Sequence, residues 1–300
     1  MGKAFKWMAI ITSVVMFILM IAGSLVTKTG SGMGCGSDWP LCNGQFIPEY
    51  TVATMIEYTH RVITGFAGIL VFVFSIWAMI RYKGSREVRG LAILGITFII
   101  VESIIGAAAV LWPQSAEVLA MHFGFSLLAF TGVALLSMYV LQKDRYHKIV
   151  KQGVSRRFKI LAWVTVVYAY LDIYSGAYLR HKKASLACWE FPGCTPEQFF
   201  PGLGGLQGIH FLHRMAGVVL FVLIAALMIY AIRHYRGVRP DLYYGSIVAF
   251  ILVLAQIMSG IAIIWTSASI FTTLAHSGFI TLLFALLFYI GIQSTKKPTR

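Results

Sequence analysis

Charged residues are scarce in this 300-residue chain, in which Asp, Glu, Lys and Arg together make up 12%. A soluble domain usually carries about twice that fraction. Hydrophobic residues instead account for 58% of the chain, and the mean hydropathy is +0.78. This composition excludes an ordinary soluble domain and indicates a protein that crosses a lipid bilayer several times.

Eight apolar runs are long enough to cross the bilayer, because about 30 Å of hydrocarbon takes roughly 20 helical residues. The first run is too long for a cleaved signal peptide and lacks a small-residue cleavage site, so we expect it to remain as a helix. The predicted fold class is therefore an all-α membrane protein with eight transmembrane helices. The expected spans are residues 7–27, 57–80, 91–112, 118–141, 159–179, 208–232, 243–266 and 271–293.

Acidic residues are fewer than basic ones, 11 against 25, which gives a net charge of +14. The basic residues gather in alternate loops, at 81–89, 143–159, 233–239 and 296–300. This alternation marks the cytoplasmic side of a membrane protein, so it argues against nucleic acid as a partner. We expect a multi-pass protein of the cell membrane with both termini in the cytoplasm. The loops expected outside are 28–56, 113–117, 180–207 and 267–270.

Cysteine is also rare, and its four positions all fall in the loops expected outside: Cys35, Cys42, Cys188 and Cys194. Neither pair has the C-x-x-C spacing of a zinc site, and the C-x-x-C-H motif that attaches a c-type haem is absent. An even count in an oxidising compartment predicts two disulfides, Cys35–Cys42 and Cys188–Cys194, each closing a short loop. These disulfides either stabilise their loops or, as the alternative, form a redox-active pair.

The chain repeats itself once. Cys35 and Cys188 lie 153 residues apart, as do His60 and His213. We therefore predict two pseudo-symmetric four-helix bundles in tandem, an N-terminal half at residues 1–145 and a C-terminal half at residues 146–300. Because each half holds an even number of helices, both should keep one orientation, as in repeats related by an axis along the membrane normal.

Four histidines lie near the outer ends of predicted spans at repeat-equivalent positions: His60, His122, His213 and His276. A single buried histidine is more often a hydrogen-bonded core residue than a ligand, but ionisable groups in membrane helices are costly and usually functional. Two imidazoles on different helices can clamp a haem iron. Zinc would need further ligands, which no Cys, Asp or Glu supplies consistently. The pattern predicts one bis-histidine haem site in each half.

The two halves differ beside these histidines. Glu57 precedes His60 by three residues and shares its helix face, whereas His210 stands at that place before His213. A carboxylate can move protons, so the first site is equipped for chemistry and the second for holding a cofactor.

Further charged residues lie in or beside the spans. Arg61 and Arg214 each follow a histidine and are suited to haem propionates, with snorkelling to the interface as the alternative. Glu102 and Asp172 lie within spans, where each either belongs to a proton path or makes a buried hydrogen bond to a neighbouring helix.

The loop TKTGSGMGCGSDWPLCNG at 27–44, the EYTHR motif at 57–61 and the paired histidines resemble the haem A synthase family over nearly the whole chain. The resemblance implies an oxidoreductase that oxidises the C8 methyl group of haem O to the formyl group of haem A, for terminal oxidase assembly. It also implies haem b as a bound redox cofactor, and haem O synthase and a membrane electron carrier as partners.

The resemblance also assigns roles to residues. It implies that His60 and His122 hold the iron of the substrate haem, that His213 and His276 hold that of haem b, and that Glu57 is catalytic. Cys35–Cys42 falls in the functional loop of the family, whereas the second pair is less uniform among members, so Cys188–Cys194 is assigned a structural role. The second loop also has no counterpart to the Asp-Trp-Pro run at 38–40, which argues against catalysis in both halves.

Two alternatives from other classes use the same histidine pairs. An electron-carrying cytochrome b would give no reason for Glu57 to break the repeat. A haem-handling transporter is compatible with the parallel repeat, but strong axial ligation in both halves would oppose release of its cargo.

Overall fold

A computed structural model describes residues 2–112, 115–145, 149–150 and 152–298. These residues form long α-helices, one short 3₁₀ helix (η1, Lys143–Arg145) and no strand, which confirms the predicted all-α fold class. Eight of the helices are long and apolar enough to cross a membrane. They are α1 (Lys3–Thr29), α2 (Val52–Arg81), α3 (Arg86–Leu111), α4 (Ala116–Gln142), α6 (Arg156–His181), α7 (Gly205–Tyr235), α8 (Pro240–Trp265) and α9 (Ile270–Thr295).

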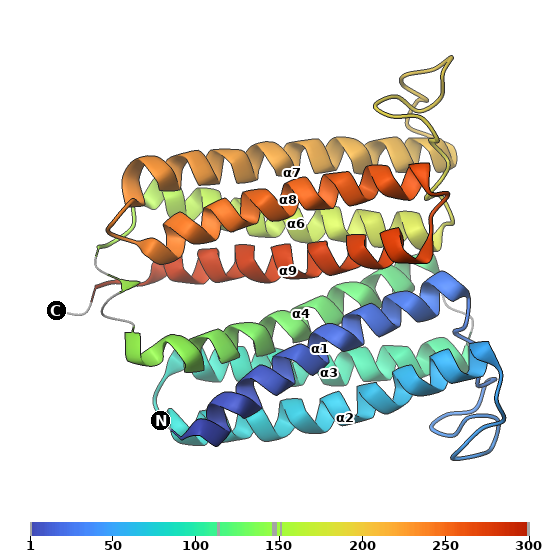
Figure 1. Cartoon of the computed structure of the whole chain (residues 1–300), viewed down its shortest axis with the longest axis horizontal. Coiled ribbons are helices and arrows are strands. Elements are labelled where there is room, and N and C mark those ends of the chain that lie inside the picture. Colours follow the sequence, from blue (N-terminus) through green and yellow to red (C-terminus); the bar gives the residue numbers. More distant parts are fainter. Residues whose placement is uncertain (1, 113–114, 146–148, 151, 299–300) are drawn as a thin grey trace. The chain divides into compact units, whose positions relative to one another are not determined.

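The chain divides into two compact units, Met1–Leu141 and Gln142–Arg300. Each unit contains four of the long helices (Figure 1). The boundary predicted between residues 145 and 146 adjoins residues 146–148, which lie outside the described part of the chain.

The first unit is a bundle of α1 to α4 packed through aromatic pairs and close helix contacts. Phe5 of α1 lies against Phe74 of α2 with ring centroids 5.8 Å apart, and Phe17 of α1 lies 6.0 Å from Phe130 of α4. A Cβ atom on Gly132 of α4 would lie 2.7 Å from the backbone nitrogen of Gly95 of α3, so these helices touch backbone to backbone. The loop between α1 and α2 lies at the end of this bundle opposite the N-terminus (Figure 1).

The second unit repeats this construction with α6 to α9. Phe158 of α6 lies 5.5 Å from Tyr230 of α7, and Tyr170 of α6 lies 5.7 Å from Phe284 of α9. The loop before α8 is fixed by the fully buried Arg239, which binds both carboxylate oxygens of Asp241 at 3.0 and 2.7 Å. A buried guanidinium needs such pairing, because an unpaired buried charge is very costly.

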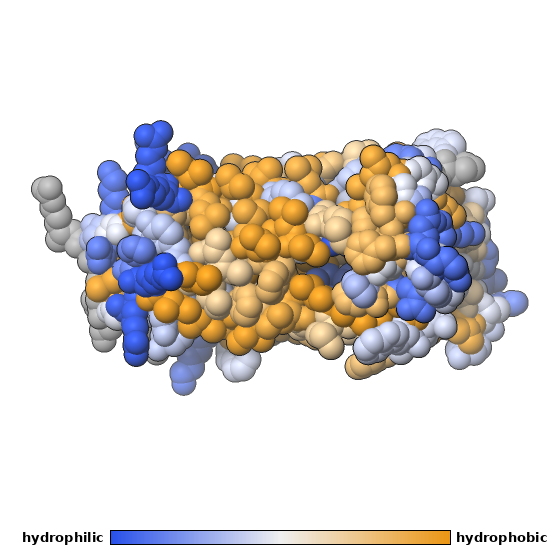
Figure 2. Space-filling view, turned by 90° about the horizontal axis from the view of Figure 1, so that it is seen from above, coloured by the Kyte–Doolittle hydropathy of each residue, from blue (hydrophilic) through white to orange (hydrophobic). Residues whose placement is uncertain are grey.

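The outer faces of both bundles carry many exposed large apolar side chains, Ile69 of α2 and Val222 of α7 among them. On the face shown in Figure 2, apolar residues occupy the middle of the length and hydrophilic residues gather at both ends. A water-soluble protein does not expose so much contiguous apolar surface. The protein is therefore a multi-pass membrane protein whose helix faces contact lipid.

Candidate functional site

The histidines of the first unit both lie near the loop end of their helices, His60 in α2 and His122 in α4. The two imidazoles therefore lie at the same end of the bundle. Each faces a glycine of another helix: a Cβ atom on Gly23 of α1 would lie 3.3 Å from Cε1 of His60, and one on Gly106 of α3 would lie 3.3 Å from Cε1 of His122. A larger residue at either glycine would press on the ring.

The histidines of the second unit have the same placement, His213 in α7 and His276 in α9. A Cβ atom on Gly176 of α6 would lie 2.8 Å from Cε1 of His213, and one on Gly260 of α8 would lie 3.3 Å from Cε1 of His276. Each unit therefore brings its two predicted ligands together at one end, and each imidazole rests on a glycine.

The imidazoles of the second unit are held by hydrogen-bonding partners at Nδ1. The hydroxyl of Ser175 lies 2.9 Å from Nδ1 of His213, and Oδ1 of Asp172 lies 3.1 Å from the same atom. The hydroxyl of Ser259 lies 2.9 Å from Nδ1 of His276. Contacts at Nδ1 fix the tautomer of an imidazole and leave Nε2 as the nitrogen that can bind a metal.

The imidazoles of the first unit lack this support. Among the residues that the structure describes, Nδ1 of His60 and Nδ1 of His122 have no hydrogen-bond partner. Oε1 of Glu102 in α3 instead lies 3.6 Å from Nε2 of His122. The repeat counterpart of Glu102 in α8 is Gln256, whose amide nitrogen lies 3.0 Å from Nε2 of His276. The same position thus carries an acid in one unit and a neutral amide in the other.

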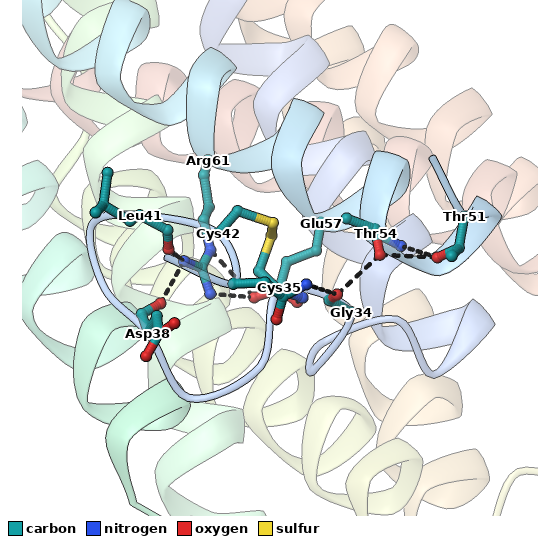
Figure 3. Close-up of a disulfide and its surroundings, with 10 residues drawn as sticks. Gly34, Cys35, Asp38, Leu41, Cys42, Thr51, Thr54, Glu57 and Arg61 are labelled. Atoms are coloured by element: carbon teal, nitrogen blue, oxygen red, sulfur yellow. Dashed lines mark hydrogen bonds and ion pairs between the residues drawn. A yellow bond between two sulfur atoms is a disulfide. The ribbon is translucent and has the colours of Figure 1, made fainter. Parts of the chain in front are cut away.

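Glu57 and Arg61 fasten the first disulfide loop to α2 (Figure 3). Oε2 of Glu57 accepts a hydrogen bond from the backbone N–H of Cys35 at 2.8 Å, and its Oε1 accepts from Nε and Nη2 of Arg61 at 3.1 and 2.5 Å. Nη1 of Arg61 donates to the carbonyl oxygens of Asp38 and Leu41 at 2.7 and 2.8 Å. The side chain of Glu57 is only 3% exposed, because the disulfide loop packs over it.

The second unit fastens its loop in the same way, with an imidazole in place of the acid. Nδ1 of the buried His210 accepts a hydrogen bond from the backbone N–H of Cys188 at 3.1 Å. Arg214 donates to the carbonyl oxygens of Cys188, Glu190 and Gly193, at 2.6, 2.7 and 2.5 Å. This anchoring role was missed in the sequence, although Glu57 and His210 share the 153-residue spacing of the first cysteines.

The sulfur atoms of each loop lie at disulfide distance, 2.05 Å for Cys35 and Cys42 and 1.99 Å for Cys188 and Cys194. Gly34, beside the first pair, allows the loop to touch α2, since a Cβ atom there would lie 2.5 Å from the carbonyl carbon of Ala53. Each predicted pair thus lies within its own loop.

The residues fit a haem better than a bare metal ion. Within the described part of the chain, no group of three or more His, Cys, Asp or Glu side chains is placed to hold a metal. A haem supplies four nitrogen ligands itself and needs only two more. The side chains of His122 and His213 are 26% and 24% exposed, so a ligand can reach them. A Cβ atom on Gly65, Gly68 or Gly217 would meet no other atom within 4 Å, so the helix surface is open there.

These features define a polytopic membrane protein of two related four-helix units, each with a pair of helix-borne imidazoles beneath an anchored disulfide loop. A family model, COX15-CtaA, described as cytochrome oxidase assembly protein, matches residues 47–288. The chain is 40% identical over 304 residues to a haem A synthase of Geobacillus kaustophilus, covering 100% of this chain and 95% of that protein. It is 42% identical over 297 residues to one of Bacillus cereus (strain 03BB102), covering 99% and 95%. The chain therefore belongs to the haem A synthase family, which confirms the resemblance seen in the sequence.

Proposed function

We propose that this protein oxidises the C8 methyl group of haem O to the formyl group of haem A, and so supplies haem A to terminal oxidases. The observation that carries this proposal is the pair of helix-borne imidazoles at the loop end of each unit, repeated at equivalent positions but with different hydrogen-bond partners. Membership of the haem A synthase family supports the same reaction.

The second unit is assigned to a permanently bound haem b, with His213 and His276 as axial ligands. Its imidazoles are oriented by Ser175, Asp172 and Ser259 through Nδ1. Residues that hydrogen-bond to a metal-binding histidine in this way typically change metal affinity by about 10–100-fold. Such a site suits a cofactor that must stay bound, and the bound haem b would carry electrons away from the substrate.

The first unit is assigned to haem O, with His60 and His122 as axial ligands. Their Nδ1 atoms have no partner among the described residues, so no hydrogen bond at Nδ1 fixes the orientation of either ring. Weaker orientation favours exchange, which a substrate that arrives as haem O and leaves as haem A requires. The unit whose histidines lack hydrogen bonds at Nδ1 is therefore assigned to the exchanging substrate, and the unit whose histidines have them is assigned to the permanent cofactor.

Glu57 is the proposed catalytic residue. It lies one helical turn before His60, buried beneath the disulfide loop, and it holds Arg61 as a counter-charge. Removing a hydride from the methyl group, or electrons before the proton, leaves positive charge at the haem edge. A carboxylate can stabilise that charge or accept the proton. General-base assistance of this kind is typically worth about 10²–10⁴-fold in rate.

Arg61 and Arg214 stay proposed partners of the haem propionates. Both guanidinium groups already donate to loop carbonyls, so a propionate would have to use the N–H bonds that these contacts leave over. This arrangement would place the propionates at the loop end of each bundle.

We also propose that the disulfide loops face outside and that both termini lie in the cytoplasm. In each unit the disulfide loop lies at the opposite end from the basic connections, which matches the charge rule for membrane proteins. Haem O synthase and a membrane electron carrier are the proposed partners, since haem O must be delivered and electrons must be removed.

The test is conversion of added haem O by the purified protein, followed by extraction and chromatography of the haems. Haem A should accumulate while haem b stays constant. If haem O persists unchanged beside a bound haem b with an electron acceptor supplied, the protein is an electron-carrying cytochrome b instead.

A further inference from the structure

Asp172 forms a cluster with Ser175 and His213 that the first unit does not contain. Its Oδ1 lies 3.1 Å from Nδ1 of His213 and 3.3 Å from the hydroxyl of Ser175, which itself lies 2.9 Å from that Nδ1. The residues at these two places in α1, one repeat earlier, are Leu19 and Ala22. The matching glycines Gly23 and Gly176, which both face a histidine, fix this alignment of α1 with α6.

The two imidazoles of the second unit therefore have unlike partners. The Nδ1 atom of His213 faces a carboxylate and a hydroxyl. The partners of His276 are neutral: the hydroxyl of Ser259 lies 2.9 Å from its Nδ1, and the amide nitrogen of Gln256 lies 3.0 Å from its Nε2. Asp172 is 7% exposed and lies in a membrane-spanning helix. An acid at such a place is costly and marks a functional role.

A carboxylate that accepts the Nδ1–H of a ligating histidine does more than hold the ring. The hydrogen bond is charge-assisted, and it raises the basicity of the nitrogen that binds the metal. A more basic axial ligand donates more electron density to iron and so stabilises the oxidised state. A hydrogen bond to the histidine that binds the iron is one of the ways in which a protein sets the reduction potential of a haem.

We propose that Asp172 is a positioning residue that makes His213 a strongly donating axial ligand and lowers the reduction potential of the haem in the second unit. This inference rests on the proposed function, because it assumes a haem between His213 and His276. The carboxylate acts through His213 and does not touch the substrate. The lowered potential keeps the cofactor oxidised and ready to accept electrons only from a sufficiently reducing substrate.

The experiment is a spectroelectrochemical titration of the purified holoprotein carrying Asp172→Asn. The amide retains the shape and an oxygen acceptor but removes the charge. At a fixed potential we expect the ratio of reduced to oxidised haem to rise about tenfold, which is about 59 mV for a one-electron couple. Asp172→Glu should return the potential toward the wild-type value, and Ser259→Ala, which removes only a neutral partner, should shift it less.

The possible failures are distinguishable. If His213→Ala abolishes the low-spin spectrum while Asp172→Asn retains both spectrum and potential, the inference about Asp172 is overturned and the cofactor site stands. If His213→Ala leaves the spectrum intact, the cofactor site itself is misplaced, and the inference falls with it. A positive shift in Asp172→Asn with an unchanged six-coordinate spectrum supports the proposal, because a merely structural role would not move the potential alone.

Discussion

Glu57 accepts a hydrogen bond from the backbone N–H of Cys35 at 2.8 Å, so the carboxylate proposed for catalysis also anchors the disulfide loop. In the second unit His210 accepts the equivalent bond from Cys188 at 3.1 Å. The anchoring task is therefore common to both units and does not by itself require an acid. What distinguishes the first unit is that its anchor carries negative charge beside His60.

This distinction gives a prediction for Glu57. In Glu57→Gln the amide keeps an acceptor for the N–H of Cys35, so the fold and both haem sites should persist. Conversion of haem O to haem A should fall by about 10²–10⁴-fold, with an alcohol product accumulating. The measurement is haem chromatography during turnover.

Glu57→His is the matched control, because it copies the anchor that the second unit uses. It should keep the loop in place and still lose conversion. Normal conversion by either variant would show that Glu57 only anchors the loop.

A second prediction concerns the cofactor ligands. His213→Ala and His276→Ala should each abolish the six-coordinate low-spin spectrum of haem b, because each removes one of the two axial nitrogens. His122→Ala, the control from the first unit, should retain that spectrum. The measurement is the absorption spectrum of each purified protein. A low-spin haem b spectrum in both the His213→Ala and His276→Ala variants would contradict the assignment of these histidines as haem b ligands.

The cysteine pairs give a third prediction. Mass spectrometry of non-reduced peptides should find Cys35 joined to Cys42 and Cys188 joined to Cys194, since each pair lies at disulfide distance within one loop. Replacing both Cys188 and Cys194 by serine should lower the free energy of unfolding by about 2 kcal/mol, because the bond closes a short loop. A peptide joining the two loops would contradict these pairings.

Glu102 gives a fourth prediction. Its side chain is buried, and its Oε2 has no hydrogen-bond partner among the described residues, which typically costs about 1–3 kcal/mol. Glu102→Gln copies its repeat counterpart Gln256 and should leave the thermal unfolding temperature equal or higher. The reverse exchange, Gln256→Glu, should lower it. A large loss of stability in Glu102→Gln would mean that the charge itself is needed to hold α3 against α4.

Much of the fold could be predicted from the sequence, because membrane spans depend on composition over some 20 residues and the repeat is visible at fixed spacing. The helix starts were less accurate. The second span was predicted to begin at residue 57, whereas α2 begins at Val52, because the side chain of Thr51 accepts the N–H of Thr54 and extends the helix beyond the apolar run.

The hydrogen-bonding partners of the histidines could not be predicted from the sequence. The contact between Asp172 and His213 joins residues of α6 and α7 that are 41 positions apart, and no periodicity reports which faces of two helices meet. The sequence placed Asp172 in a span, but only the packing at Gly176 brings α6 close enough for the carboxylate to reach Nδ1. The anchoring by Glu57 and His210 depends in the same way on how each loop folds back.

The division of labour between the two units is tested most directly by chromatography of the haems extracted from purified His60→Ala protein after incubation with haem O, beside the wild type. We expect the wild type to yield haem A together with haem b, and His60→Ala to yield haem b with no haem A. Haem A at the wild-type level from His60→Ala, or loss of haem b from that variant, would contradict a substrate site in the first unit and a separate cofactor site in the second.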